Sequence, residues 1–300
     1  MAADEIDAWV RTHLRPTGPL DLVHDTPWSR VWRIPLPGDD AAWFKACAPV
    51  QAFEPRLTAA LYHRWPDRIV EVVAHDEERG WLLLGDGGTP VGAFGNSPDA
   101  WAAALPLYAE LQQGEVAYAG EHLDGGVTDR RLALLPELYD DLIGRELPLE
   151  PEEHESLRRF APAFGELCTE LAARDIPETI QHDDLHIGNV YSKDDRMLIL
   201  DWGDASVAHP FFSLDVTFYF LEHVNHLAPG DPTFERLRDA YLEPWGAGLV
   251  DTFELALRVG TFAHAFGWLR VYDTIAPGKQ RDEFFQWFPR ILRRAVASAG

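Results

Sequence analysis

A glycine-rich stretch at residues 85–90 (G-D-G-G-T-P) separates two parts of the chain that differ in hydrophobic pattern. Before it, short runs of β-branched and aromatic residues are bounded by turn-forming residues, which is typical of strands. After it, apolar residues recur over long segments with the spacing of amphipathic helices. Because glycine and proline favour turns, the stretch itself predicts a hinge. The pattern therefore predicts an α+β fold, with a small β-rich lobe at residues 1–88 and a larger, mostly helical lobe at residues 89–300.

The expected elements follow these two patterns along the chain. In the first lobe we expect strands at residues 20–36, 41–46, 70–74 and 81–84, and helices at residues 4–15 and 51–63. In the second lobe we expect helices at residues 97–111, 132–142, 152–174, 209–225, 233–242, 250–272 and 281–297. The strand-like segment of that lobe is residues 179–204. A cleft between two such lobes is a natural site for a small molecule.

Composition and charge limit the class of partner. The 46% hydrophobic fraction excludes a disordered chain. The formal net charge of −23 argues against nucleic acid and anionic membranes, and it is compatible with a cationic substrate. No apolar run approaches the roughly 20 residues that span a bilayer, and the acidic N-terminus lacks a signal-peptide pattern, so we expect a cytoplasmic protein. Cys47 and Cys168 form no C-x-x-C pair, which argues against a disulfide framework or a zinc–thiolate site.

The densest group of polar residues lies at residues 181–204, reading Q-H-D-D-L-H-I-G-N-V-Y-S-K-D-D-R-M-L-I-L-D-W-G-D. A His-x-Asp sequence ends at Asp184, and Asn189 follows five positions later. Asp201 begins an Asp-x-Gly sequence after a short predicted hairpin. Phosphoryl transfer uses this order of residues in protein-kinase-like sites.

This segment, with Lys45 in the strand A-W-F-K-A and Glu54 in the helix that follows, resembles the aminoglycoside phosphotransferase and choline kinase-like branch of the protein-kinase-like superfamily. The resemblance covers nearly the whole chain in order, and it implies a two-lobed protein-kinase-like fold. Asp184 matches the catalytic aspartate, which would orient a hydroxyl and accept its proton. Asn189 and Asp201 match the ligands of Mg²⁺, which prefers oxygen donors.

The resemblance also implies a nucleotide site in the first lobe. Lys45 would contact the α- and β-phosphates and pair with Glu54, since a lysine that faces inward needs a partner for its charge. The loop over the phosphates would be residues 24–30, which contain no glycine, and Ser29 would donate a hydrogen bond to a phosphate. Backbone groups around Leu84 and Asp86 would meet the base of ATP or GTP.

The same resemblance implies a small-molecule kinase that uses an alcohol as phosphate acceptor. Carboxylates after Asp201 and on the rim of the second lobe would suit an amino sugar, an aminoglycoside-like compound or another amine-bearing alcohol, and tryptophan faces could stack on a sugar or a cation. The acceptor candidates are Asp215, Glu222, His223, Asn225, His226, Trp268 and Tyr272, and the rim candidates are Asp140, Asp141, Glu152, Glu153 and Glu155.

Two alternative functions use the same residues. A non-catalytic kinase-like protein would bind nucleotide and lack phosphoryl transfer. A transition-metal hydrolase would bind its metal through His182, Asp183, His186, Asp201 and His209. In the kinase interpretation, His182 and His186 brace the loop. Asp183 departs from the pattern there, because glycine is common at that position in the related enzymes.

Overall fold

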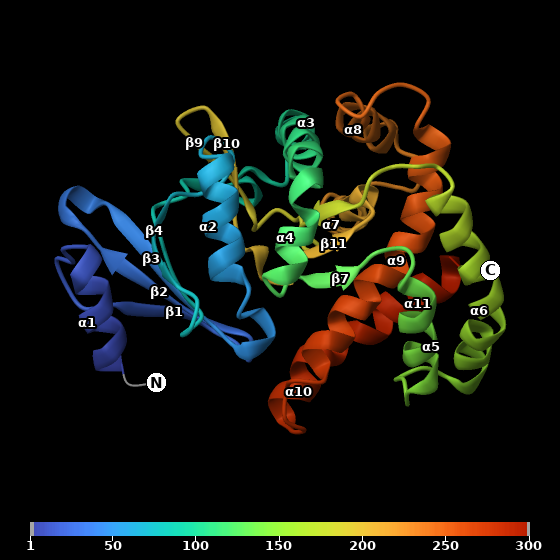
Figure 1. Ribbon diagram of the computed structural model, residues 1–300, viewed down its shortest axis with the longest axis horizontal. Helices are drawn as coiled ribbons and strands as arrows, with labels where there is room; N and C mark the ends of the chain where they lie inside the picture. The colour runs from blue at the N-terminus through green and yellow to red at the C-terminus, as the bar shows by residue number, and fades with distance from the viewer. Residues whose placement is uncertain (1–2, 299–300) are drawn as a thin grey trace. The chain divides into compact units, whose positions relative to one another are not determined.

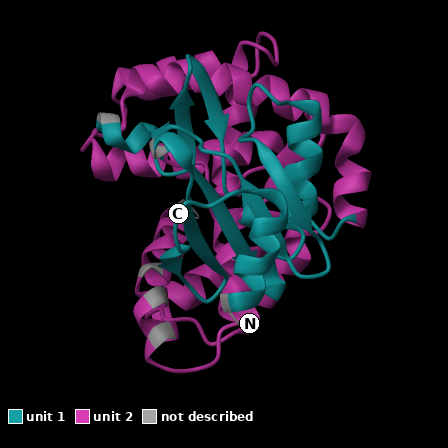
Figure 2. Cartoon of the chain, turned by 90° about the vertical axis from the view of Figure 1, so that its left-hand side faces the viewer, with its two compact units in different colours: residues 1–95, 125–127, 187–203 teal, residues 96–124, 128–186, 204–300 magenta. Residues whose placement is uncertain are grey.

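The computed structural model describes residues 3–298, and the chain forms two compact units (Figure 2). Unit 1 comprises Met1–Gly95, Gly125–Val127 and Ile187–Gly203, and unit 2 comprises Asn96–Asp124, Thr128–His186 and Asp204–Gly300. The division near Gly95 lies a few residues beyond the predicted hinge. The segment Ile187–Gly203, which the sequence pattern placed in the second lobe, belongs to unit 1.

An antiparallel sheet of five strands forms the body of unit 1. Its strands run in the order β1-β2-β3-β5-β4. Their bounds are β1 Asp21–Asp25, β2 Ser29–Pro35, β3 Ala41–Cys47, β4 Val72–Asp76 and β5 Trp81–Leu84. The long strand expected at residues 20–36 is divided between β1 and β2 by the turn around Thr26, where the Thr26 N–H donates to the Ser29 carbonyl oxygen (2.9 Å).

Alternation along β3 assigns its side chains to the two faces of the sheet. Phe44 and its same-face neighbours pack with Ile6 and Val10 of α1 (Ala3–His13), and this cluster is the main core of the unit. Lys45 alternates with Phe44 and therefore points to the opposite face. That face carries α2 (Glu54–Arg64), which contacts β4 and β5 (Figure 1).

A hairpin from the second half of the sequence completes unit 1. Its strands are β9 (Val190–Lys193) and β10 (Arg196–Ile199), and β9 also pairs with β6 (Thr89–Pro90). The two-residue turn at 194–195 has positive φ at both aspartates, which matches the twist of a hairpin. A parallel bridge between Ile69 and Ile199 holds the other end. These backbone pairings explain why residues 187–203 belong to unit 1.

Unit 2 is mainly helical, and α9 lies at its centre, in contact with α5, α6, α7 and α11. Phe262 of α9 packs against the rings of Tyr139 and Phe164, which stack on each other (4.5 Å between centroids). The helices are α3 Pro98–Glu115, α4 Ala119–Asp124, α5 Leu135–Gly144, α6 Pro151–Ala172, α7 Leu214–Val224, α8 Pro232–Leu242, α9 Val250–Tyr272, α10 Lys279–Phe284 and α11 Phe288–Ser298. The helix expected at residues 281–297 is therefore broken, because a 3-10 turn at Phe285–Trp287 separates α10 from α11.

A small sheet inside unit 2 supports the polar segment. Its strands are β7 (Thr128–Arg130), β8 (Thr179–Gln181) and β11 (Ser206–Ala208), in the order β7-β11-β8. All three strands are short, which is why the sequence pattern did not indicate β7. Across residues 3–298, the helices lack the combination of length and apolar character that a membrane crossing requires.

Candidate active site

Lys45 lies between two carboxylates in unit 1. Its Nζ is 2.5 Å from Glu54 Oε2 and 2.6 Å from Asp201 Oδ1. Glu54 reaches this position because it is the first residue of α2, on the face of the sheet to which Lys45 points. Asp201 reaches it because the β9–β10 hairpin belongs to the same unit. The structure thus brings together three residues that the sequence singled out from segments far apart in the chain.

The two carboxylates keep Lys45 charged. Burial lowers the pKa of Lys45, but Asp201 and Glu54 outweigh this effect and raise that pKa well above its usual value. Glu54 is almost fully buried, whereas the Asp201 side chain is 52% exposed. Glu54 is therefore the buried partner of the ammonium group, while Asp201 exposes part of its carboxylate to solvent. Burial also raises the pKa of Cys47 well above its usual value, so this thiol stays neutral as it donates to Glu54 (3.3 Å).

Asn189 and Asp201 flank the β9–β10 hairpin. The Leu200 N–H donates to the Asn189 carbonyl oxygen (2.9 Å), which holds the residue before Asp201 beside Asn189. The backbone of Asp201 is left-handed (φ 62°), a conformation that costs a non-glycine residue about 1 kcal/mol. One carboxylate and one amide are oxygen donors, so this pair fits the magnesium ion that the kinase resemblance implies.

The remaining predicted nucleotide contacts lie along the same sheet. Ser29 is buried at the start of β2, and its carbonyl oxygen accepts hydrogen bonds from the N–H and the hydroxyl of Thr26 (2.9 Å each). Leu84 is the last residue of β5, and the Asp86 carbonyl oxygen accepts from Lys193 Nζ (2.9 Å). The contacts of Ser29, Leu84 and Asp86 with a nucleotide stay predictions.

Asp184 lies in unit 2, on the loop that follows β8. Its backbone N–H donates to Nδ1 of the buried His182 (3.3 Å), and its carboxylate is 3.3 Å from Nε2 of His186. The loop is held from several sides, since the Tyr108 hydroxyl accepts from the His182 N–H (2.9 Å) and the Thr217 hydroxyl donates to the carbonyl oxygen of the residue after Asp184 (2.7 Å). The Asp184 carboxylate is 37% exposed, so it can meet a substrate.

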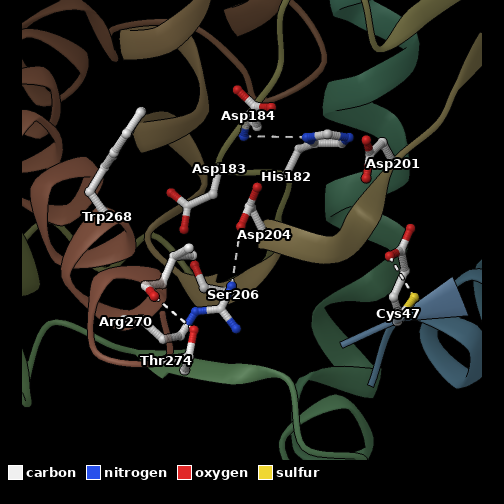
Figure 3. A network of polar contacts seen from close by, with 12 residues as sticks. Cys47, His182, Asp183, Asp184, Asp201, Asp204, Ser206, Trp268, Arg270 and Thr274 are labelled. Carbon is white, nitrogen blue, oxygen red and sulfur yellow. Dashed lines mark hydrogen bonds and ion pairs between the residues drawn. The ribbon is translucent and has the colours of Figure 1, made fainter. Parts of the chain in front are cut away.

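Asp183 has a different environment from its neighbour. It is buried and forms an ion pair with Arg130 of β7, and it accepts a hydrogen bond from Gln181 (2.5 Å). Figure 3 shows the carboxylates of Asp183 and Asp184 pointing in different directions. Burial lowers the pKa of Arg130 to about 9, so Arg130 remains a cation at neutral pH. The ion pair gives a structural reason for the departure at Asp183. The sequence analysis missed Arg130, because a single arginine after a glycine-rich turn carries no signal of its distant partner.

A cavity of about 570 Å³ opens beside Asp184 in unit 2. Its walls come from α7, α9 and α11 together with Asp184 and His186. Most of the surface that lines it is apolar, although many of the side chains that contribute to it also carry polar groups, and this mixture is typical of a small-molecule site. The aromatic wall consists of Tyr219, Phe220 and Trp268.

The cavity contains some of the predicted acceptor residues and not others. His223 and Trp268 line it. Asp215 is buried and paired with Arg294 (2.8 Å), whereas Asn225 bonds to Asn96 (2.5 Å). Glu222, His226 and Tyr272 do not contribute to the lining as described, and neither do the rim candidates Asp140, Asp141, Glu152, Glu153 and Glu155. The sequence analysis missed His264, Arg290 and Arg294, which lie on helical faces that only the packing of α9 and α11 identifies.

The ligand set of a transition-metal hydrolase is not assembled. Within residues 3–298, no three or more His, Cys, Asp and Glu side chains are grouped so that they could hold a metal ion. One ring nitrogen in each of two of these histidines already accepts a hydrogen bond, Nδ1 of His182 from the Asp184 N–H and Nδ1 of His209 from the Phe211 N–H (3.3 Å each). Asp183 is committed to Arg130.

Comparison with known proteins places these residues in a family. The model of the phosphotransferase enzyme family matches residues 22–254, which include both the Lys45 group and Asp184. A search of curated proteins found no match.

Several solved structures share the fold at low sequence identity. The choline kinase LicA from Streptococcus pneumoniae has a TM-score of 0.68 and 12% identity, covering 99% of this chain and 98% of that one. An ethanolamine kinase from Plasmodium vivax has a TM-score of 0.62 and 11% identity, covering 97% and 85%. The macrolide 2'-phosphotransferase MphH from Brachybacterium faecium has a TM-score of 0.57 and 18% identity, covering 92% and 99%. The predicted α+β, protein-kinase-like fold is thereby confirmed.

Proposed function

The chain belongs to the phosphotransferase enzyme family, and we propose that it transfers the γ-phosphate of a nucleoside triphosphate to a hydroxyl held beside Asp184. The family membership that the sequence predicted is confirmed, and with it the activity of a small-molecule kinase with an alcohol acceptor. The observation that carries the proposed roles of individual residues is the position of Lys45 between Glu54 and Asp201.

Lys45 is the proposed ligand of the nucleotide phosphates. Its charge is maintained by two carboxylates, of which the exposed one, Asp201, can turn to another ligand. We assign Asp201 and Asn189 to a magnesium ion, because their oxygen atoms suit that metal and a backbone hydrogen bond joins Asn189 to Leu200, the residue before Asp201. A bound magnesium ion would neutralise phosphate charge and polarise the transferring group. Ser29 and the backbone around Leu84 and Asp86 would complete the nucleotide site.

Asp184 is the proposed residue that orients the acceptor. A partly exposed carboxylate at the wall of a cavity can accept a hydrogen bond from a bound hydroxyl and take its proton as the oxygen attacks. His186 contacts the carboxylate and stacks on Phe220 (4.7 Å between ring centroids), so it restricts the directions that Asp184 can take. Positioning and charge stabilisation account for most catalysis in this reaction class.

Calorimetry of nucleotide binding tests the roles of Lys45 and Asp201. Lys45→Met and Asp201→Asn should each weaken the binding of ATP with magnesium by about 10- to 100-fold, the effect of losing a charge-assisted hydrogen bond. Lys279→Met, at a lysine that is 89% exposed, is the matched control and should bind like wild type. Unchanged affinity in both test variants would refute the nucleotide site. The same titration with GTP determines which nucleotide the enzyme prefers.

The non-catalytic alternative predicts nucleotide binding without transfer. The exposed carboxylate of Asp184 at a cavity favours a working enzyme, because a protein that only binds nucleotide has no need of it. Thermal stabilisation by nucleotide with and without magnesium, followed by assay against a panel of alcohols, separates the two. For the hydrolase alternative, zinc or iron in stoichiometric amounts in the purified protein would support it, and we expect neither.

The acceptor class that the sequence favoured, an amine-bearing alcohol, stays a prediction. It is supported by the net charge of −23 for the whole chain and by the Trp268 ring at the cavity wall, which could stack on a sugar or a cation. The wall of the cavity itself contains Arg290 and Arg294, which favours a different class of acceptor.

A further inference from the structure

The aromatic wall of the cavity is built from stacked pairs. The Tyr219 ring stacks on His223 (3.9 Å between centroids, 27° between planes), and the Phe220 ring stacks on His186 (4.7 Å, 19°). The guanidinium of Arg294 lies over the Tyr219 ring at 5.4 Å from its centroid. Part of the aromatic surface that could attract a substrate ammonium is therefore already covered by three protein groups, each of which can carry positive charge itself.

The carboxylate of Asp215, behind the wall, already has partners within the protein. Asp215 is buried, and its oxygen atoms contact Arg294 (2.8 Å) and the Thr261 hydroxyl (3.1 Å), with His264 at 3.7 Å. Burial would raise the pKa of Asp215, but Arg294 and His264 reverse the effect and lower that pKa. A substrate amine could use Asp215 only by displacing Arg294, which would leave the arginine without its buried partner.

Asp184 is accordingly the carboxylate that the described part of the lining offers to a substrate. In the proposed reaction it accepts the hydrogen bond and the proton of the acceptor hydroxyl, so an ammonium group at the same carboxylate would compete with that hydroxyl. The remaining charged groups of the wall are Arg290, which is exposed, and Arg294, both on α11. An arginine at the wall of an apolar cavity favours an anionic group and disfavours an ammonium group.

We propose that the acceptor is a largely apolar alcohol that carries an acidic group, which meets Arg290, and no amine. The inference rests on the proposed function and names the substrate class of its acceptor site. Val216, Val224 and Ile291 add apolar surface to the lining, so the acceptor's carbon skeleton gains affinity by leaving water. The acid contributes orientation, because it fixes one end of the molecule while the hydroxyl lies at Asp184.

Matched compounds test this class without knowledge of the natural substrate. We would compare 4-(hydroxymethyl)benzoate, 4-methylbenzyl alcohol and 4-(aminomethyl)benzyl alcohol, which share a hydroxymethyl ring and differ in charge at the far end. Calorimetric binding without nucleotide should rank them in that order, with the acid about tenfold tighter than the amine, the size of effect expected for one partly exposed charge contact and one repulsion.

Variants of Arg290 test whether this side chain causes the tighter binding of the acid. Arg290→Gln should reduce binding of the acid to within about twofold of the methyl compound, since the charge contact is lost, and Arg290→Lys should restore most of it. Arg293→Gln is the matched control on the same helix, because Arg293 pairs with Glu153 (2.9 Å) and does not line the cavity. It should leave the ranking unchanged.

The outcomes separate this inference from the kinase proposal. Equal or tighter binding of the amine, retention of the ranking in Arg290→Gln, or failure of all three compounds to bind at millimolar concentration would overturn the acceptor class. None of these results bears on the binding of magnesium and nucleotide by Lys45 and Asp201, because that binding is measured in a separate experiment. Conversely, loss of the nucleotide site with the ranking intact would refute the kinase proposal and leave the chemistry of the cavity in place.

Discussion

At the scale of single residues, Asp183 shows how a departure from a family pattern is stabilised. Its backbone is left-handed (φ 66°), where glycine would be free of strain, yet the chain has an aspartate there. The ion pair with the buried Arg130 gives the reason, because an arginine without a counter-charge in a protein interior is much more costly than the strain. Arg130 in turn fixes the residue next to Asp184.

We predict that Asp183→Gly destabilises the protein. Relief of backbone strain would stabilise it by about 1 kcal/mol, but a broken buried ion pair costs about 3 to 5 kcal/mol, so the second effect prevails. Urea unfolding should therefore show a net loss of about 2 to 4 kcal/mol.

The control is Asp175→Gly, at an exposed residue with a similar backbone (φ 59°), which should be neutral or slightly stabilising. Combining Asp183→Gly with Arg130→Leu should recover part of the lost stability. If Asp183→Gly were as stable as wild type, the ion pair would not be what maintains this position.

At the scale of elements, the short 3-10 segment Pro210–Ser213 begins at a buried histidine. Nδ1 of His209 accepts from the Phe211 N–H, so the imidazole is the cap of the segment and must be neutral at that nitrogen. Burial lowers the pKa of His209 to about 3. The unfolded chain binds this proton near pH 6.5, so the folded state loses stability as the pH falls from 6.5 towards 3.

We predict that His209→Asn makes stability less dependent on pH. Asparagine keeps a cap acceptor and does not titrate, so the variant should lose less stability than wild type between pH 7 and pH 5, by about 2 kcal/mol. Urea unfolding at the two pH values measures this difference. His24→Asn, at an exposed histidine of β1, should keep the pH response of wild type. An unchanged response in His209→Asn would show that His209 does not titrate as described.

The pairing of β6 with β9 depends on a glycine at position 88. It has positive φ (86°), and a Cβ there would clash with the backbone of Ser192 in β9. We predict that Gly88→Ala separates β6 from β9, disturbs the hairpin that presents Asp201, and weakens nucleotide binding. Gly38→Ala is the control, because Gly38 also has positive φ (78°) and has open space around its Cβ position. Equal nucleotide affinity in both variants would contradict this reasoning.

The sequence identified candidate residues that belong to local motifs, and it missed contacts that depend on packing between distant segments. One short segment contains Asp184, Asn189 and Asp201, and one strand with its following helix contains Lys45 and Glu54. The order of these residues can therefore be recognised from the sequence. Arg130 and Asp183 are far apart in the sequence, and nothing in either segment indicates the other. Arg290 and Arg294 belong to a short helix whose place beside α7 and α9 depends on the packing of unit 2.

At the scale of the whole molecule, each unit supplies one half of the proposed reaction. Unit 1 contains the Lys45 group and the proposed magnesium ligands, and unit 2 contains Asp184 and the acceptor cavity. Binding of nucleotide and binding of acceptor can therefore be measured by separate variants. The net charge of −23 is a property of the whole chain, whereas the cavity wall carries arginines, so the acceptor class proposed here rests on the cavity and not on the overall charge.

The central claim is tested most directly by transfer of labelled γ-phosphate from ATP with magnesium to an alcohol acceptor, in wild type and in Asp184→Asn. We predict transfer by wild type and a reduction of about 10²- to 10⁴-fold in the variant, the usual contribution of a catalytic base, with magnesium–ATP affinity unchanged. Normal transfer by Asp184→Asn would contradict the account, because the acceptor hydroxyl would then react without the carboxylate assigned to it.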